Sequence, residues 1–299
     1  MTNLKIAVVG IPGKWSTEVL ADRLEALTGF RAVIDMADVT LAFDTQTVMH
    51  KGLDLSQLDG IIIKKISEVY SPEAEDRTRI LSYLEASGVR VFSPSHTVAQ
   101  MINRLSGTLA LQQGKIPMPN TRITENTQEA LKAVRLFGSA ILKPLYSTKA
   151  RGMQMIDDSW DDAQALAALE QFKTEQGLFY IQQTIELNGK DLGMVFLGGE
   201  YVCTYARVGA AGAWNTTIHS GGHYENYQPD EALIELGRRA QGCYDLSFTT
   251  VDIALTEEGP FIFEVSAFGG FKGAKEGCGI DVAKQYAEYV VDQLENKSR

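Results

Sequence analysis

The chain has 299 residues, a formal net charge of −10 and three cysteines. A chain of this length exceeds one minimal hydrophobic core, so we expect two or three subdomains. The negative charge argues against nucleic acid as a partner, because no basic stripe is present to neutralise phosphates. No apolar run approaches the roughly 18 residues of a membrane span, and the sequence enters a strand directly after Met-Thr-Asn. Since the cysteines are also scattered, we expect a cytoplasmic protein without a membrane partner.

Short apolar runs alternate with helical periodicity through the first 95 residues. Leu4–Val9 is a continuous apolar run, which is typical of a buried parallel strand. A helix follows, for which Ser16 or Thr17 is the predicted N-cap. The intervening GIPGK does not have the spacing of a phosphate-binding loop, so we interpret it as a strand-to-helix turn. The alternation indicates a small open α/β domain. Its other predicted elements are strands at residues 31–36, 60–66 and 89–92 and a helix at residues 72–87.

The rest of the chain predicts two further units that mix helices and strands. The first has predicted helices at residues 96–113, 127–137 and 161–174 and predicted strands at residues 139–145, 153–156 and 178–185. The second is mainly strands from Asp191 onward, with helices at residues 229–244 and 280–294. The predicted domains are therefore residues 1–95, 96–185 and 186–299.

Residues 249–266 predict a β-hairpin, because apolar and polar residues alternate on both sides of a Gly-Pro turn. If Leu255 pairs with Phe261, then Asp252 lies opposite Glu264, with Ser266 two residues further along the same face. Two carboxylates about 4–5 Å apart repel by roughly 4 kcal/mol at an effective dielectric constant of about 20. Such a pair needs a cation, or one acid must be protonated, and oxygen ligands favour Mg²⁺ or Mn²⁺ over zinc.

The alternative for this hairpin is a solvated sheet face on which two acids merely coincide. The sequence FGGFKGAKEGCG follows the hairpin directly. Glycine-rich turns pack poorly, but they are useful where the backbone must approach a ligand. This stretch therefore favours a ligand site over a solvated face.

Several basic residues are predicted from their sequence positions to bind anions. Lys143 lies in the apolar run SAILKPL, where a lysine is costly to bury without an anionic partner such as phosphate. Lys149 and Arg151 belong to the polar loop that follows, a basic flap for phosphates. Arg207 ends the strand YVCTYA before a run of small residues, as at an open pocket. The alternatives are an edge-strand lysine, a solvated loop and a surface arginine.

The order of these features resembles the ATP-grasp superfamily and is closest to the RimK-type α-L-glutamate ligases. The resemblance is strongest over Val251–Ala283, with V-D-I, E-V-x-A-x-x-G and G-I-D in succession. It implies a fold of α/β and α+β type, with an N-terminal open α/β domain and two α+β lobes enclosing ATP. The implied cofactors are ATP and Mg²⁺ (or Mn²⁺), and a homo-oligomer is the implied assembly.

The resemblance implies a role for each matching residue on the nucleotide side. Arg104 would contact the nucleotide phosphates, and Lys143 the α- and β-phosphates. Gln182 and Gln183 would lie on the hinge that meets adenine. Asp191 resembles the acid that opens the second lobe near the ribose or the substrate.

On the transfer side the resemblance is less complete. Arg207 resembles the arginine that stabilises the transferring phosphate, and Asp252 and Glu264 resemble the magnesium carboxylates. Ser266 stands where the family usually has asparagine as third metal ligand. Gly193 stands where the family has an arginine, and the flap is bulkier and more basic than usual.

The activity implied is a carboxylate–amine ligase that forms an amide through an acyl phosphate, with Arg207 and Lys143 as catalytic residues. The leading prediction is addition of an amino acid such as glutamate to a small coenzyme or metabolite. One alternative is modification of a peptide or protein tail, which the acidic surface permits. Another is a nucleotide-binding regulator without turnover, which the altered substrate region and Ser266 suggest.

Overall fold

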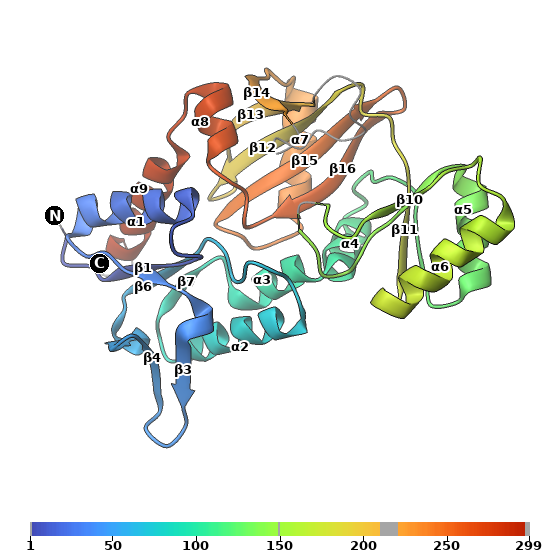
Figure 1. Ribbon diagram of the computed structural model, residues 1–299. Helices are drawn as coiled ribbons and strands as arrows, with labels where there is room; N and C mark the ends of the chain where they lie inside the picture. Colours follow the sequence, from blue (N-terminus) through green and yellow to red (C-terminus); the bar gives the residue numbers. More distant parts are fainter. Residues whose placement is uncertain (1, 149, 210–220, 297–299) are drawn as a thin grey trace.

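A computed structural model describes residues 2–148, 150–209 and 221–296, which form four sheets and the helices that cover them (Figure 1). No helix in these ranges is long and apolar enough to cross a membrane. The helices are α1 (Trp15–Thr28), α2 (Pro72–Ala86), α3 (Ser95–Ile102), α4 (Arg104–Gln113), α5 (Thr127–Phe137), α6 (Asp162–Gln176), α7 (Glu231–Gln241), α8 (Lys272–Cys278) and α9 (Val282–Glu295).

The N-terminal part is built on a parallel sheet in the order β2-β1-β6-β7. Helices α1 and α9 cover one face and α2 covers the other, so both faces of these short strands are buried. Helix α1 leads from β1 outward to β2, whereas α2 leads from β6 outward to β7, so the strand order switches direction between β1 and β6. The strands are β1 (Ile6–Val9), β2 (Val33–Ile34), β6 (Gly60–Ile63) and β7 (Arg90–Phe92).

A small antiparallel sheet between β2 and β6 was not predicted from the sequence. Its outer hairpin projects from the N-terminal part in Figure 1. Because its strands are only two to four residues long, their alternation gives a weak signal in the sequence. The three strands are β3 (Val39–Ala42), β4 (Thr47–His50) and β5 (Leu53–Asp54).

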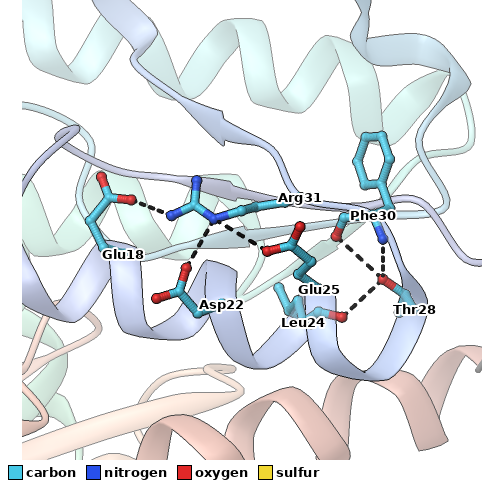
Figure 2. A network of polar contacts seen from close by, with 7 residues as sticks. All are labelled: Glu18, Asp22, Leu24, Glu25, Thr28, Phe30 and Arg31. Carbon is cyan, nitrogen blue, oxygen red and sulfur yellow. Dashed lines mark hydrogen bonds and ion pairs between the residues drawn. The ribbon is translucent and has the colours of Figure 1, made fainter.

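A cluster of ion pairs ties the segment before β2 to α1 (Figure 2). Arg31 Nη2 lies 2.5 Å from Glu18 Oε2, and its Nε lies 2.9 Å from Asp22 Oδ1 and 3.7 Å from Glu25 Oε2. These acids are spaced to lie along one side of the helix, so one arginine reaches all three. The cluster is largely exposed, so each pair contributes at most about 1 kcal/mol.

Two predictions about helix boundaries are wrong. Helix α1 begins at Trp15 after Lys14, so Ser16 and Thr17 lie inside it and neither is its cap. The single helix predicted at residues 96–113 is two helices that meet at Asn103, whose backbone is extended. Its side chain accepts hydrogen bonds from the first turn of α4, so the break also begins the next helix.

The central part of the chain forms a small lobe, drawn in green at the right of Figure 1, which we call lobe A. Its antiparallel sheet has the order β10-β9-β11-β8, and helices α5 and α6 pack on it. Its buried apolar residues form a separate core that runs from Ala130 to Ile181. The strands are β8 (Thr121–Thr124), β9 (Ala140–Leu142), β10 (Gln154–Ile156) and β11 (Phe179–Gln183).

The last third forms a five-stranded antiparallel sheet, which with α7 and α8 we call lobe B. The order is β14-β13-β12-β15-β16. Helix α7 packs on one face, and α8 lies against β13 and β14 on the other. The two largest cores each join residues of the N-terminal part to residues of lobe B. The strands are β12 (Lys190–Leu197), β13 (Glu200–Val208), β14 (His223–Asn226), β15 (Phe248–Thr256) and β16 (Gly259–Ser266).

Candidate active site

The hairpin β15–β16 places Asp252 directly opposite Glu264, which confirms the central expectation from its sequence. The predicted pairing of Leu255 with Phe261 is wrong, because Leu255 pairs with Pro260. A shift of register beside Asp252 restores the predicted pairing of the two acids. The sequence alternation therefore placed the acids correctly without revealing the irregularity between them and the turn.

The register shift leaves Phe263 as an extra residue in β16, which is the pattern of a β-bulge. Phe263 and its neighbour Glu264 consequently line the same cavity, together with Arg104 and Ser147. The ring of Phe263 also lies beneath the ammonium of Lys143, with Nζ 5.5 Å from its centroid. The bulge thus brings the hairpin into contact with the basic residues of lobe A.

Arg207 joins two acids at one end of the lobe B sheet. Its Nη2 lies 2.5 Å from Asp191 Oδ2 and 3.1 Å from Asp252 Oδ2. The pKa of Asp252 is raised to about 6, chiefly by burial, with Arg207 acting to lower it and Asp191 and Glu264 acting to raise it. Burial alone would lower the pKa of Arg207, but the two aspartates hold it well above its ordinary value. One guanidinium therefore contacts two acids, and a third acid, Glu264, lies opposite Asp252, which favours a bound cation.

Lys143 lies one residue beyond β9, although its N–H still donates to Tyr180 O at 2.9 Å. Its buried Nζ donates to Gln182 Oε1 at 2.5 Å. The pKa of this lysine is lowered to about 7, chiefly by burial and also by Arg104, while Glu264 partly opposes the shift. A buried lysine paired with an amide is suited to gain an anion, because an incoming phosphate would restore its charge.

Arg104 connects α4 to the segment that leads into the flap. Its Nε donates to Pro144 O at 3.2 Å and its Nη2 to Ser147 Oγ at 3.1 Å. Arg151 is exposed on the flap, and Lys149 lies outside the described residues. Arg104 lines the cavity, and Lys143 lies over the ring of Phe263, which lines the same cavity, whereas Arg151 is exposed to solvent.

The two glutamines predicted on the hinge occupy different environments. Gln182 is buried between Lys143 and Thr121, to which its Nε2 donates at 3.0 Å. Gln183 is half-buried and accepts from Asn120 Nδ2 at 2.8 Å. Sequence reasoning missed that the Gln182 side chain positions Lys143, a role that two adjacent glutamines do not signal. The contact of both residues with adenine remains a prediction.

Ser266 begins the glycine-rich turn rather than projecting freely from the sheet. Its Oγ accepts from Phe268 N at 3.1 Å. A side chain at Gly269 would collide with Thr250, so the turn lies directly on β15. The role of Ser266 as third metal ligand remains a prediction.

Asp252 and Glu264 suit a magnesium ion. Mg²⁺ is usually held by one or two carboxylates, with substrate phosphates and water completing its shell. Within the described ranges no group of three or more His, Cys, Asp or Glu residues is placed to hold a metal by itself. The two acids therefore fit a site that the nucleotide would complete.

Lys64 and Tyr205 were not identified from the sequence. Lys64 is buried after β6, and its Nζ donates to Phe268 O at 3.2 Å and to Gly269 O. A pair of lysines after an apolar run was its only signal. Tyr205 lies over Gly193, where the resemblance leads one to expect an arginine. One tyrosine within a strand has nothing in the sequence around it that marks it as a functional residue.

An acid pair on a hairpin, with a buried lysine on the facing lobe, defines an ATP-grasp architecture. A family model of the RimK-like ATP-grasp domain matches residues 103–290, and the chain belongs to this family. Its members form C–N bonds at the expense of ATP, so the protein is an ATP-grasp ligase.

Known proteins align with this chain over most of its length. It is 25% identical to a tetrahydromethanopterin:α-L-glutamate ligase of Methanosarcina acetivorans, with 99% of each chain covered. It is 24% identical to a probable α-L-glutamate ligase of Stenotrophomonas maltophilia, with 84% of each covered. Among solved structures, the ATP-grasp ligase PsnB in complex with a precursor variant, Mg and ADP superposes with a TM-score of 0.75. That structure covers 98% of this chain and all of its own at 15% identity, which shows the shared fold.

Proposed function

We propose that the protein adds an amino acid such as glutamate to a small coenzyme or metabolite, using ATP and Mg²⁺ (or Mn²⁺). The observation that supports the chemistry best is the pairing of Asp252 with Glu264 beside Arg207. The choice of substrate is supported by the end-to-end similarity to a ligase named for tetrahydromethanopterin and glutamate.

The proposed reaction has two steps. A carboxylate oxygen of one substrate attacks the γ-phosphorus of ATP, so that an acyl phosphate forms and ADP leaves. The amine of the second substrate then attacks the acyl carbon, phosphate leaves, and the nitrogen loses a proton. Phosphoryl transfer depends mainly on positioning and on neutralising charge, so no protein nucleophile is required.

Each residue of the site has a part in this scheme. Lys143 binds phosphate oxygens from lobe A, and Arg207 stabilises charge on the transferring group from lobe B. Asp252 and Glu264 hold the magnesium ion, which neutralises phosphate charge when it is bound. The flap that carries Arg151 would close over the bound phosphates and exclude water, which would otherwise hydrolyse the acyl phosphate.

Hydroxylamine trapping tests the proposal without knowledge of the natural amine. The protein is incubated with Mg-ATP, a metabolite extract and hydroxylamine, and products are analysed by mass spectrometry. We expect an ATP-dependent hydroxamate whose mass identifies the carboxylate substrate. Tight ADP binding without any hydroxamate would contradict a small carboxylate and would lead to a repeat with peptides. Absence of both would contradict the assignment of the nucleotide site.

A peptide or protein tail is the second candidate for the carboxylate partner. The observation that favours it is the net charge of −10, which would attract a basic segment. Product masses separate the two candidates, because a peptide product retains the fragment ions of its parent. Assembly into a homo-oligomer remains a prediction, which light scattering would test.

A further inference from the structure

Three glycines from two elements, β12 and α8, enclose Tyr205. A side chain at Gly193 on β12, or at Gly273 on α8, would collide with the ring. A side chain at Gly277 on α8 would lie 2.9 Å from Tyr205 Cβ. The ring of Tyr224 meets that of Tyr205 edge-on, with centroids 5.4 Å apart. The ring is therefore clamped between the sheet and α8, and its position depends on the absence of side chains at these sites.

The position of Tyr205 in the sheet directs it toward the acid pair. Tyr205, Gly193, Asp252 and Glu264 pair in succession across β13, β12, β15 and β16. Paired residues share a face, so these four form one row across the sheet. A side chain at Gly193 would lie 2.6 Å from the Tyr205 hydroxyl oxygen, which places that oxygen above β12. The next residue of the row beyond Gly193 is Asp252.

The hydroxyl of Tyr205 is available for a ligand. The residue is only 4% exposed, yet none of the residues that the structure describes hydrogen-bonds its hydroxyl. Its oxygen atom is not completely enclosed by protein atoms, so a ligand at the edge of the packed region can reach it. Burial raises the pKa of this phenol, so it remains a protonated donor. Buried hydroxyl groups normally have a hydrogen-bond partner, which a bound substrate would supply here.

We propose that the hydroxyl of Tyr205 donates a hydrogen bond to an oxygen of the bound amino-acid substrate, beside Arg207 and Asp252. The ring of Tyr205 then forms one wall of the transfer site. Gly193, its partner on β12, makes room for the ring because it has no side chain. The proposal rests on the ligase function given above, and it names a specificity residue of that same site. A neutral donor at this wall selects a substrate that presents a polar oxygen there.

Tyr205→Phe tests the proposal, because it removes the hydroxyl and retains the ring. Tyr201→Phe is the matched control: it lies on the same strand, but its ring packs against the core on the opposite face. Both variants and the wild type are compared by ADP release with L-glutamate as the amine and, as the carboxylate, the substrate that the hydroxylamine trap identifies. We expect Tyr205→Phe to slow glutamate-dependent turnover at low L-glutamate by about tenfold to a hundredfold, because loss of a hydrogen bond to a charged oxygen weakens binding by about that factor. Mg-ADP affinity and the melting temperature of Tyr205→Phe should stay unchanged, and Tyr201→Phe, which loses only the hydrogen bond to Thr204, should turn over at the wild-type rate.

A second measurement detects the hydroxyl without turnover. The protein is labelled with ¹³C at the ζ carbon of tyrosine, and the signal missing from Tyr205→Phe identifies Tyr205. We expect this signal to shift when L-glutamate is added to the Mg-ADP complex, and the Tyr201 signal to stay in place. A wild-type rate in Tyr205→Phe would overturn the proposal.

The two measurements also separate this proposal from the proposed function. If the wild type forms no hydroxamate, the proposed function has failed and the labelled signal decides the role of Tyr205. In that case, a Tyr205 signal whose chemical shift does not change when L-glutamate is added would overturn the inference as well.

Discussion

At the scale of single residues, the site is defined by an imbalance of charge. Arg207 contacts Asp191 and Asp252, while Glu264 lies opposite Asp252 and is exposed. The pKa of Asp252 is raised to about 6, which shows that Arg207 does not fully offset burial and the neighbouring acids. A divalent cation would remove that conflict and would hold both acids in their charged form.

Replacement of Glu264 by alanine tests the acid pair. We expect nucleotide-dependent turnover to fall at least about a hundredfold, because magnesium would lose one of two protein ligands. The fold should persist, since Glu264 is exposed. ADP release and far-UV circular dichroism measure the two effects. Glu258→Ala in the turn of the same hairpin is the control, and near wild-type turnover in Glu264→Ala would contradict the metal assignment.

Lys143 should make ATP binding depend on pH. Its pKa of about 7 means that the free enzyme loses this charge as pH rises, whereas bound phosphate would raise the pKa again. ATP binding above pH 7 should therefore take up a proton, and affinity should fall by up to about tenfold per pH unit between pH 7.5 and 9. Calorimetry in two buffers with different ionisation enthalpies measures the uptake.

Lys143→Met supplies the comparison for that experiment. We expect weaker ATP binding and no proton uptake from this site. Lys132→Met on the exposed surface of α5 should behave as the wild type. Proton uptake that persists in Lys143→Met would assign the titration to another group.

At the scale of elements, the sequence predicted the hairpin because its alternation is strong on both sides of the turn. It did not predict the bulge at Phe263, since one extra residue changes the register without changing composition. Helix α8 was also missed, because Gly273 and Gly277 disfavour helices. Both glycines pack against Tyr205, so a tertiary contact outweighs the local preference. The break at Asn103 has no proline or glycine to mark it.

The glycine-rich turn offers a matched pair of substitutions. At Gly269 a methyl group would collide with Thr250, whereas at Gly270 its nearest neighbour is Ser16 Oγ at 3.9 Å. Gly269→Ala should therefore lift the turn from β15, lowering stability by about 1–3 kcal/mol and slowing turnover. Gly270→Ala should leave both close to wild type. Thermal unfolding and ADP release measure these effects, and equal behaviour of the two variants would refute the close packing.

At the scale of the whole molecule, the N-terminal part and lobe B share two hydrophobic cores, whereas lobe A has its own core. Lys64 also links the first two parts, since it extends from the end of β6 and donates to the carbonyls of Phe268 and Gly269. Its ammonium also lies 4.5 Å from the centroid of the Phe271 ring. The domain boundaries predicted after residues 95 and 185 remain predictions, and lobe A is the part with a separate core.

Lys64 should make stability depend on pH. Its pKa is lowered to about 7, chiefly by burial and also by the neighbouring Lys65. The unfolded chain, with a pKa near 10.4, then binds more protons than the folded protein between these values, so stability should rise with pH across this interval. Relative to Lys64→Met, the wild type should gain about 1–3 kcal/mol of unfolding free energy from pH 7 to 9.

Urea unfolding at both pH values measures this gain. Lys5→Met is the control. Because Lys5 is exposed, its substitution should change the unfolding free energy equally at both pH values. A pH-independent difference between the wild type and Lys64→Met would show that Lys64 does not titrate between pH 7 and 9.

The packing of α9 has a consequence for synthesis on the ribosome. This helix lies against α1 and helps to cover the first sheet, and Arg90 Nη1 donates to Gln293 O at 2.6 Å. The apolar face that β1 and β6 present therefore stays incompletely covered until residues 282–295 have been translated. Strands β1 and β6 emerge long before α9, which exposes the nascent chain to chaperones and proteases in the interval.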